Sequence, residues 1–468
     1  MTAVAKHEID LTTGSILKKL IRFAIPIILM NILQILFNVA DIAVLGIFVG
    51  DMEVGAVGAT SALVSLIVNL FIGLSVGTNV ILAKCVGERD EEKAHRIVGT
   101  SVFMSLVIGF FLTFVGFFGA RTFLVWMDCD PILIDNATLY LKIYFLGMPI
   151  IMLYNFMAAI MRAVGDTFRP MIFLLIAGVV NFGLNIFFIL VFDMSVEGVA
   201  IATVASNAIS AILAVIVCLK SKGYGRLRFK YLKIYKKEFL DIIKIGIPSG
   251  LQSTMFSISN VIIQTTINSY GAVGTTANTV AQQFDQFIAQ VGASMALACM
   301  SFVSQNRGAG KFKRIKQVIV RSIIVTVSLA FVVGSIVVLT SESLCRIMSK
   351  DTEVIRYAKQ RLYTLGLTFF ICGAMEILNY SLRAMGKSVT AMIVSLCFAC
   401  AFRILWLNTF YLLNPTFLMI FISYPISWLL NVIVASIILI RLLKKEQSKL
   451  ENERSSIQDQ ANELTNNG

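Results

Sequence analysis

The stretch FAIPIILMNILQILFN at residues 23–38 is matched in the second half of the chain by IGIPSGLQSTMFSISN at residues 245–260. Both stretches belong to long apolar runs, and shifting the second half onto the first by 222 residues places Pro248 over Pro26. The same shift places one asparagine over another at the end of the two stretches. A proline and an asparagine at matching places in two apolar runs indicate an internal repeat.

Two further pairs of segments recur at almost the same spacing. MRAVGDT (161–167) aligns with LRAMGKS (382–388), and GERDEEK (87–93) aligns with GAGKFKR (308–314), each at an offset of 221 residues. Because three alignments share nearly one offset, we predict two halves with the same fold.

The composition argues against a water-soluble enzyme, since 57% of the residues are hydrophobic, 14% are charged and the mean hydropathy is +0.83. The apolar residues form twelve runs, each long enough to cross about 30 Å of hydrocarbon as a helix. The runs lie at about 16–44, 55–83, 97–120, 138–161, 170–192, 196–219, 240–269, 276–303, 316–340, 361–383, 389–412 and 417–441. Alternating segments of about ten residues, typical of a membrane β-barrel, do not occur. We therefore predict an all-α integral membrane protein with about twelve transmembrane helices.

The net charge of +13 is explained by membrane topology rather than by nucleic-acid binding. If the N-terminus is cytoplasmic, 32 of the 40 Lys and Arg residues fall in the two tails and the inner loops. This asymmetry follows the positive-inside rule. We therefore predict a multi-pass protein of the cell membrane with both termini in the cytoplasm and no nucleic-acid partner. Of the other eight cations, Arg361 is expected beside an outer loop, and Arg403 alone inside a helix.

The longest basic interruption, KSKGYGRLRFKYLKIY at residues 220–235, follows the sixth apolar run and predicts the boundary between the halves. The expected organisation is a six-helix bundle at 1–219, a cytoplasmic basic linker at 220–239, a second six-helix bundle at 240–443 and a polar cytoplasmic tail at 444–468. Six spans return the chain to the side on which it began, so the two repeats should be parallel. Parallel repeats of this kind are typical of transporters.

The paired turns RAVGDTFRP and LRAMGKS, the segment SQNRGAGKFKR after the eighth run and the opening GIPSGLQS of the seventh resemble the multidrug and toxic compound extrusion (MATE) family. The resemblance extends from about Ile16 to Leu443. It implies two six-helix lobes in a V shape around a central cavity, and multidrug efflux by alternating access in which organic cations are exchanged for Na⁺ or H⁺. We expect the lipid bilayer and small organic cations as partners, a monomer as the working unit, and no cofactor besides Na⁺ as a coupling ion.

Ionisable residues inside hydrocarbon are costly, so each is a functional candidate. Asp41 lies toward the outer end of the first run, where Asn31, Gln34, Asn38 and Asp41 recur at steps of three and four residues. Because a polar stripe facing lipid would leave its groups without hydrogen-bond partners, we expect it to face the bundle interior or a water-filled cavity.

In the fifth run, Asn181 and Asn185 share one face at a similar depth. A carboxylate with amide oxygens suits Na⁺, whereas a buried carboxylate suits proton uptake. We therefore predict a cation-coupling site of Asp41, Asn38, Asn181 and Asn185, with Na⁺ at Asp41 as the candidate metal; a helix-linking role for Asp41 is the alternative. The MATE resemblance implies that the Asp41 position belongs to a cation site in the N-terminal lobe. A second acid is frequent there in the family, and here Asn185 holds its position.

Polar residues in the other apolar runs supply candidates for a substrate cavity. They are Gln34, Gln252, Asn260, Gln264, Gln282, Asp285, Glu376 and Arg403. Either Asp285 or Glu376 offers negative charge to a cationic substrate, or Arg403 neutralises one of them as a structural pair.

Pro26 and Pro248 each remove a backbone hydrogen bond from a predicted helix. Because they occupy matching positions in the first and seventh runs, we predict that they act as hinges between the two bundles. Static kinks that shape the cavity are the alternative interpretation.

Motifs for other chemistry are missing. Gly386-Lys387-Ser388 is the nearest match to a P-loop, but Ser381 stands where the first glycine is required, so ATP is not the expected energy source. No His and Cys cluster with metal-ligand spacing and no G-x-S-x-G elbow occurs, which favours a transporter over an enzyme. Two alternatives stay open: a lipid-linked oligosaccharide flippase of the same superfamily, and a channel or membrane-embedded enzyme.

Overall fold

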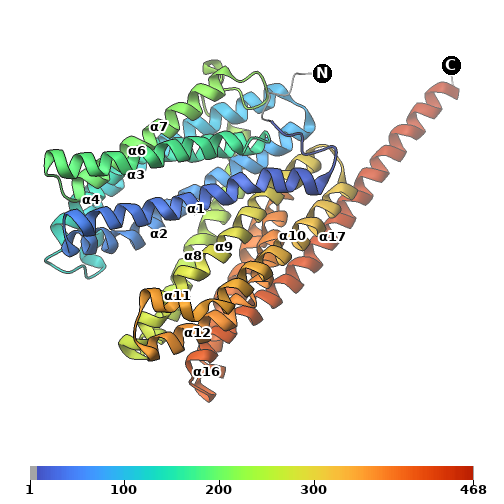
Figure 1. Ribbon diagram of the computed structural model, residues 1–468. Helices are drawn as coiled ribbons and strands as arrows, with labels where there is room; N and C mark the ends of the chain where they lie inside the picture. The colour runs from blue at the N-terminus through green and yellow to red at the C-terminus, as the bar shows by residue number, and fades with distance from the viewer. Residues whose placement is uncertain (1–7, 467–468) are drawn as a thin grey trace. The chain divides into compact units, whose positions relative to one another are not determined.

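The structure is a computed structural model that describes residues 8–466, and within them it is helical throughout, without strands (Figure 1). The helices are α1 Ile16–Phe48, α2 Asp51–Glu88, α3 Glu91–Trp126, α4 Ile134–Leu146, α5 Met148–Ala163, α6 Phe168–Phe192, α7 Val196–Lys220, η1 Phe229–Tyr231, α8 Lys236–Asn268, α9 Gly271–Gly308, α10 Phe312–Leu339, α11 Ser341–Met348, α12 Thr352–Gly366, α13 Phe369–Ala384, α14 Ser388–Ser395, η2 Leu396–Ala401, α15 Phe402–Leu407, α16 Phe410–Leu413 and α17 Phe417–Asn466.

The predicted membrane spans are present as helices. Nine described helices are long and apolar enough to cross a bilayer, and two bent pairs, α4 with α5 and α12 with α13, raise the number to eleven. The helix α8 covers the seventh predicted run and extends over 33 residues. Its Ser, Thr and Gln residues lower the hydrophobicity of this helix. With it, the expected fold of about twelve spans is confirmed.

Two of the runs expected as continuous spans are broken. The run at 138–161 bends by 50° between α4 and α5, because Pro149 lies in the first turn of α5 and cannot continue the hydrogen-bond ladder of α4. The run at 361–383 bends by 47° between α12 and α13. Here the Thr368 hydroxyl donates to the carbonyl of Thr364 at 2.6 Å and competes with the backbone.

The described chain forms two compact units. The first contains the described residues up to Leu11 together with Lys18–Val261, and the second contains Thr12–Leu17 and the described residues from Ile262 onward. In the first unit, α3 packs on α4 and α5, and α6 packs on α7. In the second, α9 is the central helix and contacts α10, α12 and α13.

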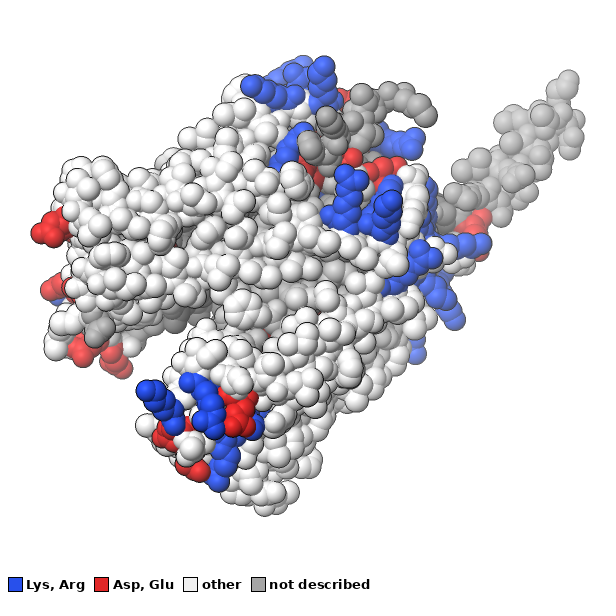
Figure 2. Space-filling view, in the orientation of Figure 1, with Lys and Arg blue, Asp and Glu red and all other residues white. Residues whose placement is uncertain are grey.

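The outer flanks of the helices are apolar and the charges gather near the helix ends (Figure 2). On α3, the exposed side chains Phe110, Phe114 and Phe118 recur every four residues and are 64%, 65% and 70% exposed. An exposed aromatic stripe of this length would be unfavourable in water, so it is the surface expected to contact lipid.

Candidate functional site

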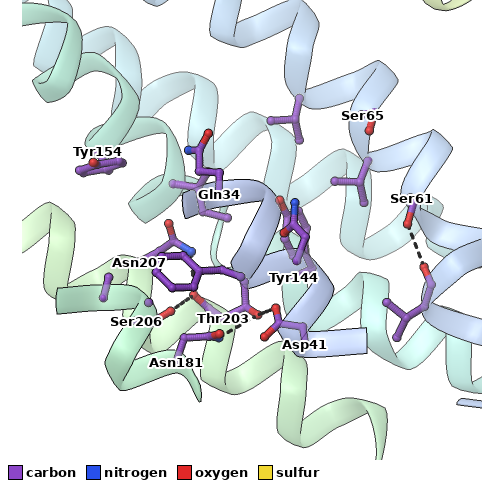
Figure 3. Close-up of a pocket in the computed structure, with 18 of the residues that line it drawn as sticks. Gln34, Asp41, Ser61, Ser65, Tyr144, Tyr154, Asn181, Thr203, Ser206 and Asn207 are labelled. Atoms are coloured by element: carbon purple, nitrogen blue, oxygen red, sulfur yellow. Dashed lines mark hydrogen bonds between the residues drawn. The ribbon is translucent and has the colours of Figure 1, made fainter. Parts of the chain in front are cut away.

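The first unit contains a cavity of about 420 Å³ lined by α1, α2 and α4–α7. Asp41 contributes the charged side chain among its lining residues, and the rest of the polar lining is uncharged. Figure 3 shows Asp41 near Thr203 and Asn181. The cavity is large enough for a small organic molecule, the size class of ordinary ligand sites.

Four side chains from three helices form a closed ring of hydrogen bonds at the wall of this cavity, where Asp41, Asn181 and Thr203 line it and Asn185 is buried behind them. Asn185 donates to Asp41 Oδ1 at 2.6 Å, and the same amide nitrogen approaches Asn181 Oδ1 at 3.5 Å. Asn181 in turn donates to Thr203 Oγ1 at 3.5 Å, and Thr203 donates to Asp41 Oδ2 at 3.5 Å. Each carboxylate oxygen of Asp41 therefore has a partner in the ring, Asn185 at short distance and Thr203 at a longer one.

Local sequence explains why these residues meet. Asn181 and Asn185 are four residues apart on α6, so they lie on one face of that helix. Gly178, one turn earlier, lies against the ring of Phe37 from α1, and a Cβ at Gly178 would collide with that ring. This contact brings α1 close to α6 and allows Asp41 to reach Asn185.

The ring offers oxygen ligands of the kind that a hard cation prefers. Asn185 is completely buried, and its Oδ1 has no hydrogen-bond partner among the described residues. Because the O and N atoms of an amide are assigned from the surrounding hydrogen bonds, a rotated Asn185 would present this oxygen to an ion at Asp41. Carboxylate, amide and hydroxyl oxygens in one ring can thus hold either Na⁺ or a proton.

An aromatic wall faces the same cavity. Tyr140 and Tyr144 lie one turn apart on α4 and stack with ring centroids 6.1 Å apart and an angle of 15° between the rings. Tyr154 also lines the cavity and donates from its hydroxyl to the carbonyl of Pro170 at 3.1 Å. Aromatic faces near a carboxylate are suited to flat organic cations.

The structure brings together three of the four residues predicted for cation coupling, namely Asp41, Asn181 and Asn185. Asn38, the fourth, lines the cavity with Gln34, outside the hydrogen-bonded ring. Sequence reasoning missed Thr203, because a threonine in an apolar helix is ordinary. It also missed the tyrosine pair, although the spacing of Tyr140 and Tyr144 at four residues was a usable signal.

The acidic candidate Asp285 is already paired. Its Oδ2 accepts from Arg361 Nε at 2.8 Å, and Arg361 also bonds to Asn278. Asn278 donates to Gln264 at 2.9 Å, so the cluster links α9, α12 and α8 within the second unit. Arg361, expected beside an outer loop, is instead buried in α12, because the carboxylate of Asp285 compensates its charge.

Arg403 pairs with neither acid among the described residues. It is buried, donates to Ser427 Oγ at 3.0 Å and lies over the ring of Tyr424 at 3.8 Å. The alternative in which Arg403 neutralises Asp285 or Glu376 is therefore wrong: aromatic faces and a hydroxyl take the place of a carboxylate.

Three further candidates lie outside the cavity around Asp41. Gln252 is buried in α8, and Asn260 and Gln282 are exposed on α8 and α9. None of these three side chains lines the cavity around Asp41.

The comparisons with known proteins agree with this architecture. The sequence model of the MatE family matches residues 26–187 and again residues 248–407, so each half matches the same family by itself. The chain is 28% identical over 390 residues to the probable multidrug resistance protein YpnP of Bacillus subtilis (strain 168), covering 83% of this chain and 86% of that protein. It is 25% identical to the probable multidrug resistance protein NorM of Thermotoga maritima, covering 81% and 82%.

A solved structure of a MATE protein in the straight conformation has the same fold. It superposes with a TM-score of 0.88 at 20% sequence identity and covers 94% of this chain and 98% of that one. The double match to the family model covers more than half of the sequence. The chain belongs to the multidrug and toxic compound extrusion family of multi-pass membrane transporters.

Proposed function

We propose that this protein is a secondary active multidrug antiporter that exports organic cations from the cell in exchange for Na⁺ or H⁺. The observation that carries the proposal is the hydrogen-bonded ring of Asp41, Asn185, Asn181 and Thr203 at the wall of a cavity whose other lining residues are uncharged. One negative charge can be neutralised by an ion or by a cationic substrate, and mutual exclusion between the two is the basis of exchange.

The mechanism follows from that competition. An organic cation enters the cavity, stacks against Tyr140 and Tyr144, and balances the charge of Asp41. Arrival of Na⁺ or a proton at Asp41 removes the attraction, and the substrate leaves. Exchange between the two sides of the membrane then requires alternating access, with cytoplasmic termini and the positively charged loops on the inner side.

The flippase alternative receives no support from the cavity. A lipid-linked oligosaccharide carries pyrophosphate, which requires cationic side chains, and the residues that line the described cavity include none. The carboxylate of Asp41 would repel such a substrate.

The test is ethidium transport by proteoliposomes of the purified chain under an imposed Na⁺ or pH gradient. Wild-type protein should transport ethidium against its gradient, and Asp41→Asn should abolish gradient-driven transport without loss of folded protein. Glu197→Gln, which removes an acid of the same unit outside the cavity, is the matched control and should transport normally. Gradient-driven transport by Asp41→Asn at the wild-type rate would refute the proposal.

A further inference from the structure

The linker between α7 and α8 combines dense positive charge with exposed apolar side chains. Residues 220–237 contain eight Lys and Arg and no Asp or Glu. At its centre, in η1, Phe229 is 72% exposed between the exposed side chains of Arg228 and Lys230. Ile234 is a second exposed apolar residue, at 45%. Figure 2 shows a blue cluster at the end of the first unit where α7 ends.

The linker is held against α3 instead of projecting into solvent. Thr100 of α3 donates from its hydroxyl to the carbonyl of Lys233 at 3.3 Å and accepts from the backbone N–H of Tyr235 at 3.2 Å. The backbone of Tyr231 lies so close to Gly99 that a Cβ there would collide with it. The linker therefore runs back along α3, past the first turns of that helix.

This attachment fixes the position of η1 along α3. Thr100 is the tenth residue of α3, so it lies roughly 13 Å along the axis from Glu91, at about 1.5 Å per residue. The charged part of α3 ends at Arg96, and residues 97–120 contain no charged side chain. Because η1 lies beside Gly99, it is at the level where α3 passes from charged to apolar residues, which is where lipid headgroups meet acyl chains.

We propose that this linker is a membrane-surface anchor that binds anionic phospholipid headgroups. Lys230 and Lys233 contact the phosphates together with Arg228, which also approaches Glu91 of α3 at 3.7 Å, and Phe229 enters the boundary between headgroups and acyl chains. Segments that anchor proteins at the membrane surface combine exposed aromatic side chains with flanking cations, as this linker does. The positive-inside rule alone explains where the charges lie, but it predicts neither the exposed Phe229 nor a preference for one lipid over another.

The full chain in nanodiscs of mixed phosphatidylglycerol and phosphatidylcholine tests the proposal. The association of each spin-labelled lipid with the protein gives the preference for the anionic lipid, measured at low and high salt. Wild-type protein should prefer phosphatidylglycerol, and R228Q/K230Q/K233Q should reduce the preference by at least roughly fivefold, the factor expected for one Lys or Arg at an anionic surface. Phe229→Ser should keep a preference at low salt that disappears at high salt, whereas wild-type protein retains part of its preference.

The matched control is K313Q/K316Q/R321Q, which removes three exposed cations of α10 that have no exposed aromatic residue between them. It should keep the wild-type preference. The proposal would be overturned if the control and the linker variant lost the preference for phosphatidylglycerol equally. It would also be overturned if wild-type protein showed no preference between the two lipids. Linker-dependent binding of a polyuridine RNA by a wild-type protein without lipid preference would assign the surface to nucleic acid instead and would also overturn it. Asp41→Asn should retain the lipid preference, which separates this proposal from the transport function.

Discussion

At the residue scale, Thr203 is the member of the ring whose removal is cleanest to interpret. Thr203→Val keeps the shape of the side chain and deletes the hydroxyl that links Asn181 to Asp41. A hydrogen bond to a charged group contributes about 1.5–3 kcal/mol, so we expect the apparent affinity for the coupling ion to fall by about 10- to 150-fold. The measurement is ethidium transport as a function of Na⁺ concentration and of pH. Thr203→Ser should restore the affinity, and a valine variant with unchanged ion dependence would remove Thr203 from the site.

The pair of Asp285 and Arg361 has a different predicted role, because each charge is already neutralised by the other. Arg361→Met leaves a buried carboxylate without its cation and should destabilise the protein by about 3–5 kcal/mol. The double variant Asp285→Asn with Arg361→Met should recover much of that loss. Thermal unfolding of the purified variants in detergent is the measurement. A double variant that is as unstable as Arg361→Met would show that the pair does more than compensate charge.

Functional residues could be predicted from the sequence where a polar side chain lies in an apolar run, because burying such a side chain in hydrocarbon is costly. Asp41, Asn181 and Asn185 could be selected because they are polar in apolar runs and share helical spacing. Thr203 could not be selected in that way, since Thr satisfies its hydroxyl within a helix and occurs in many membrane spans. The partner of Asp285 was also beyond reach, because Arg361 lies 76 residues away and only the tertiary structure brings the two together.

At the element scale, helix positions were predictable, and most breaks within helices were not. The apolar run of α4 and α5 is interrupted at Gly147 and Pro149, residues that mark a possible bend without requiring one. The bend after α12 has no proline, and there the hydroxyl of Thr368 donates to the carbonyl of Thr364. Hydropathy indicates only whether a segment lies in hydrocarbon or in water. It therefore does not distinguish a straight transmembrane helix from a bent one.

Pro26 in α1 is the element-scale candidate for a hinge, with Pro248 of α8 at the matching place of the repeat. Pro26→Ala restores a backbone donor and should stiffen α1. If α1 must bend during transport, ethidium binding should survive within about twofold while gradient-driven turnover falls at least about tenfold, the loss expected from a barrier raised by about 1.4 kcal/mol. Binding and turnover are measured separately on the same preparation. Normal turnover would mean that Pro26 only shapes the cavity.

At the scale of the whole molecule, the repeat was the strongest prediction from the sequence. The offset of 222 residues between Pro26 and Pro248 is also the offset between the starts of the two family matches, at residues 26 and 248. Repeats are detectable in one sequence because both copies preserve their turns.

The orientation of the chain in the membrane is a prediction of the charge distribution alone. In a cysteine-free background, a cysteine at Asp130 should react with an impermeant thiol reagent added to intact cells, and a cysteine at Lys230 should react only after the cells are opened. Asp130 lies between α3 and α4, and Lys230 lies in η1 at the opposite end of α3 from that loop. The reversed labelling pattern would overturn the proposed topology.

The central claim is that substrate and coupling ion compete for the charge of Asp41, and release of the ion on substrate binding tests it most directly. Purified protein in detergent is titrated with ethidium while bound Na⁺ and the pH of a weakly buffered solution are followed. We predict that wild-type protein releases Na⁺ or protons in proportion to the ethidium bound, and that Asp41→Asn releases neither. Ethidium binding to wild-type protein without release of either ion, or equal release by Asp41→Asn, would contradict the account.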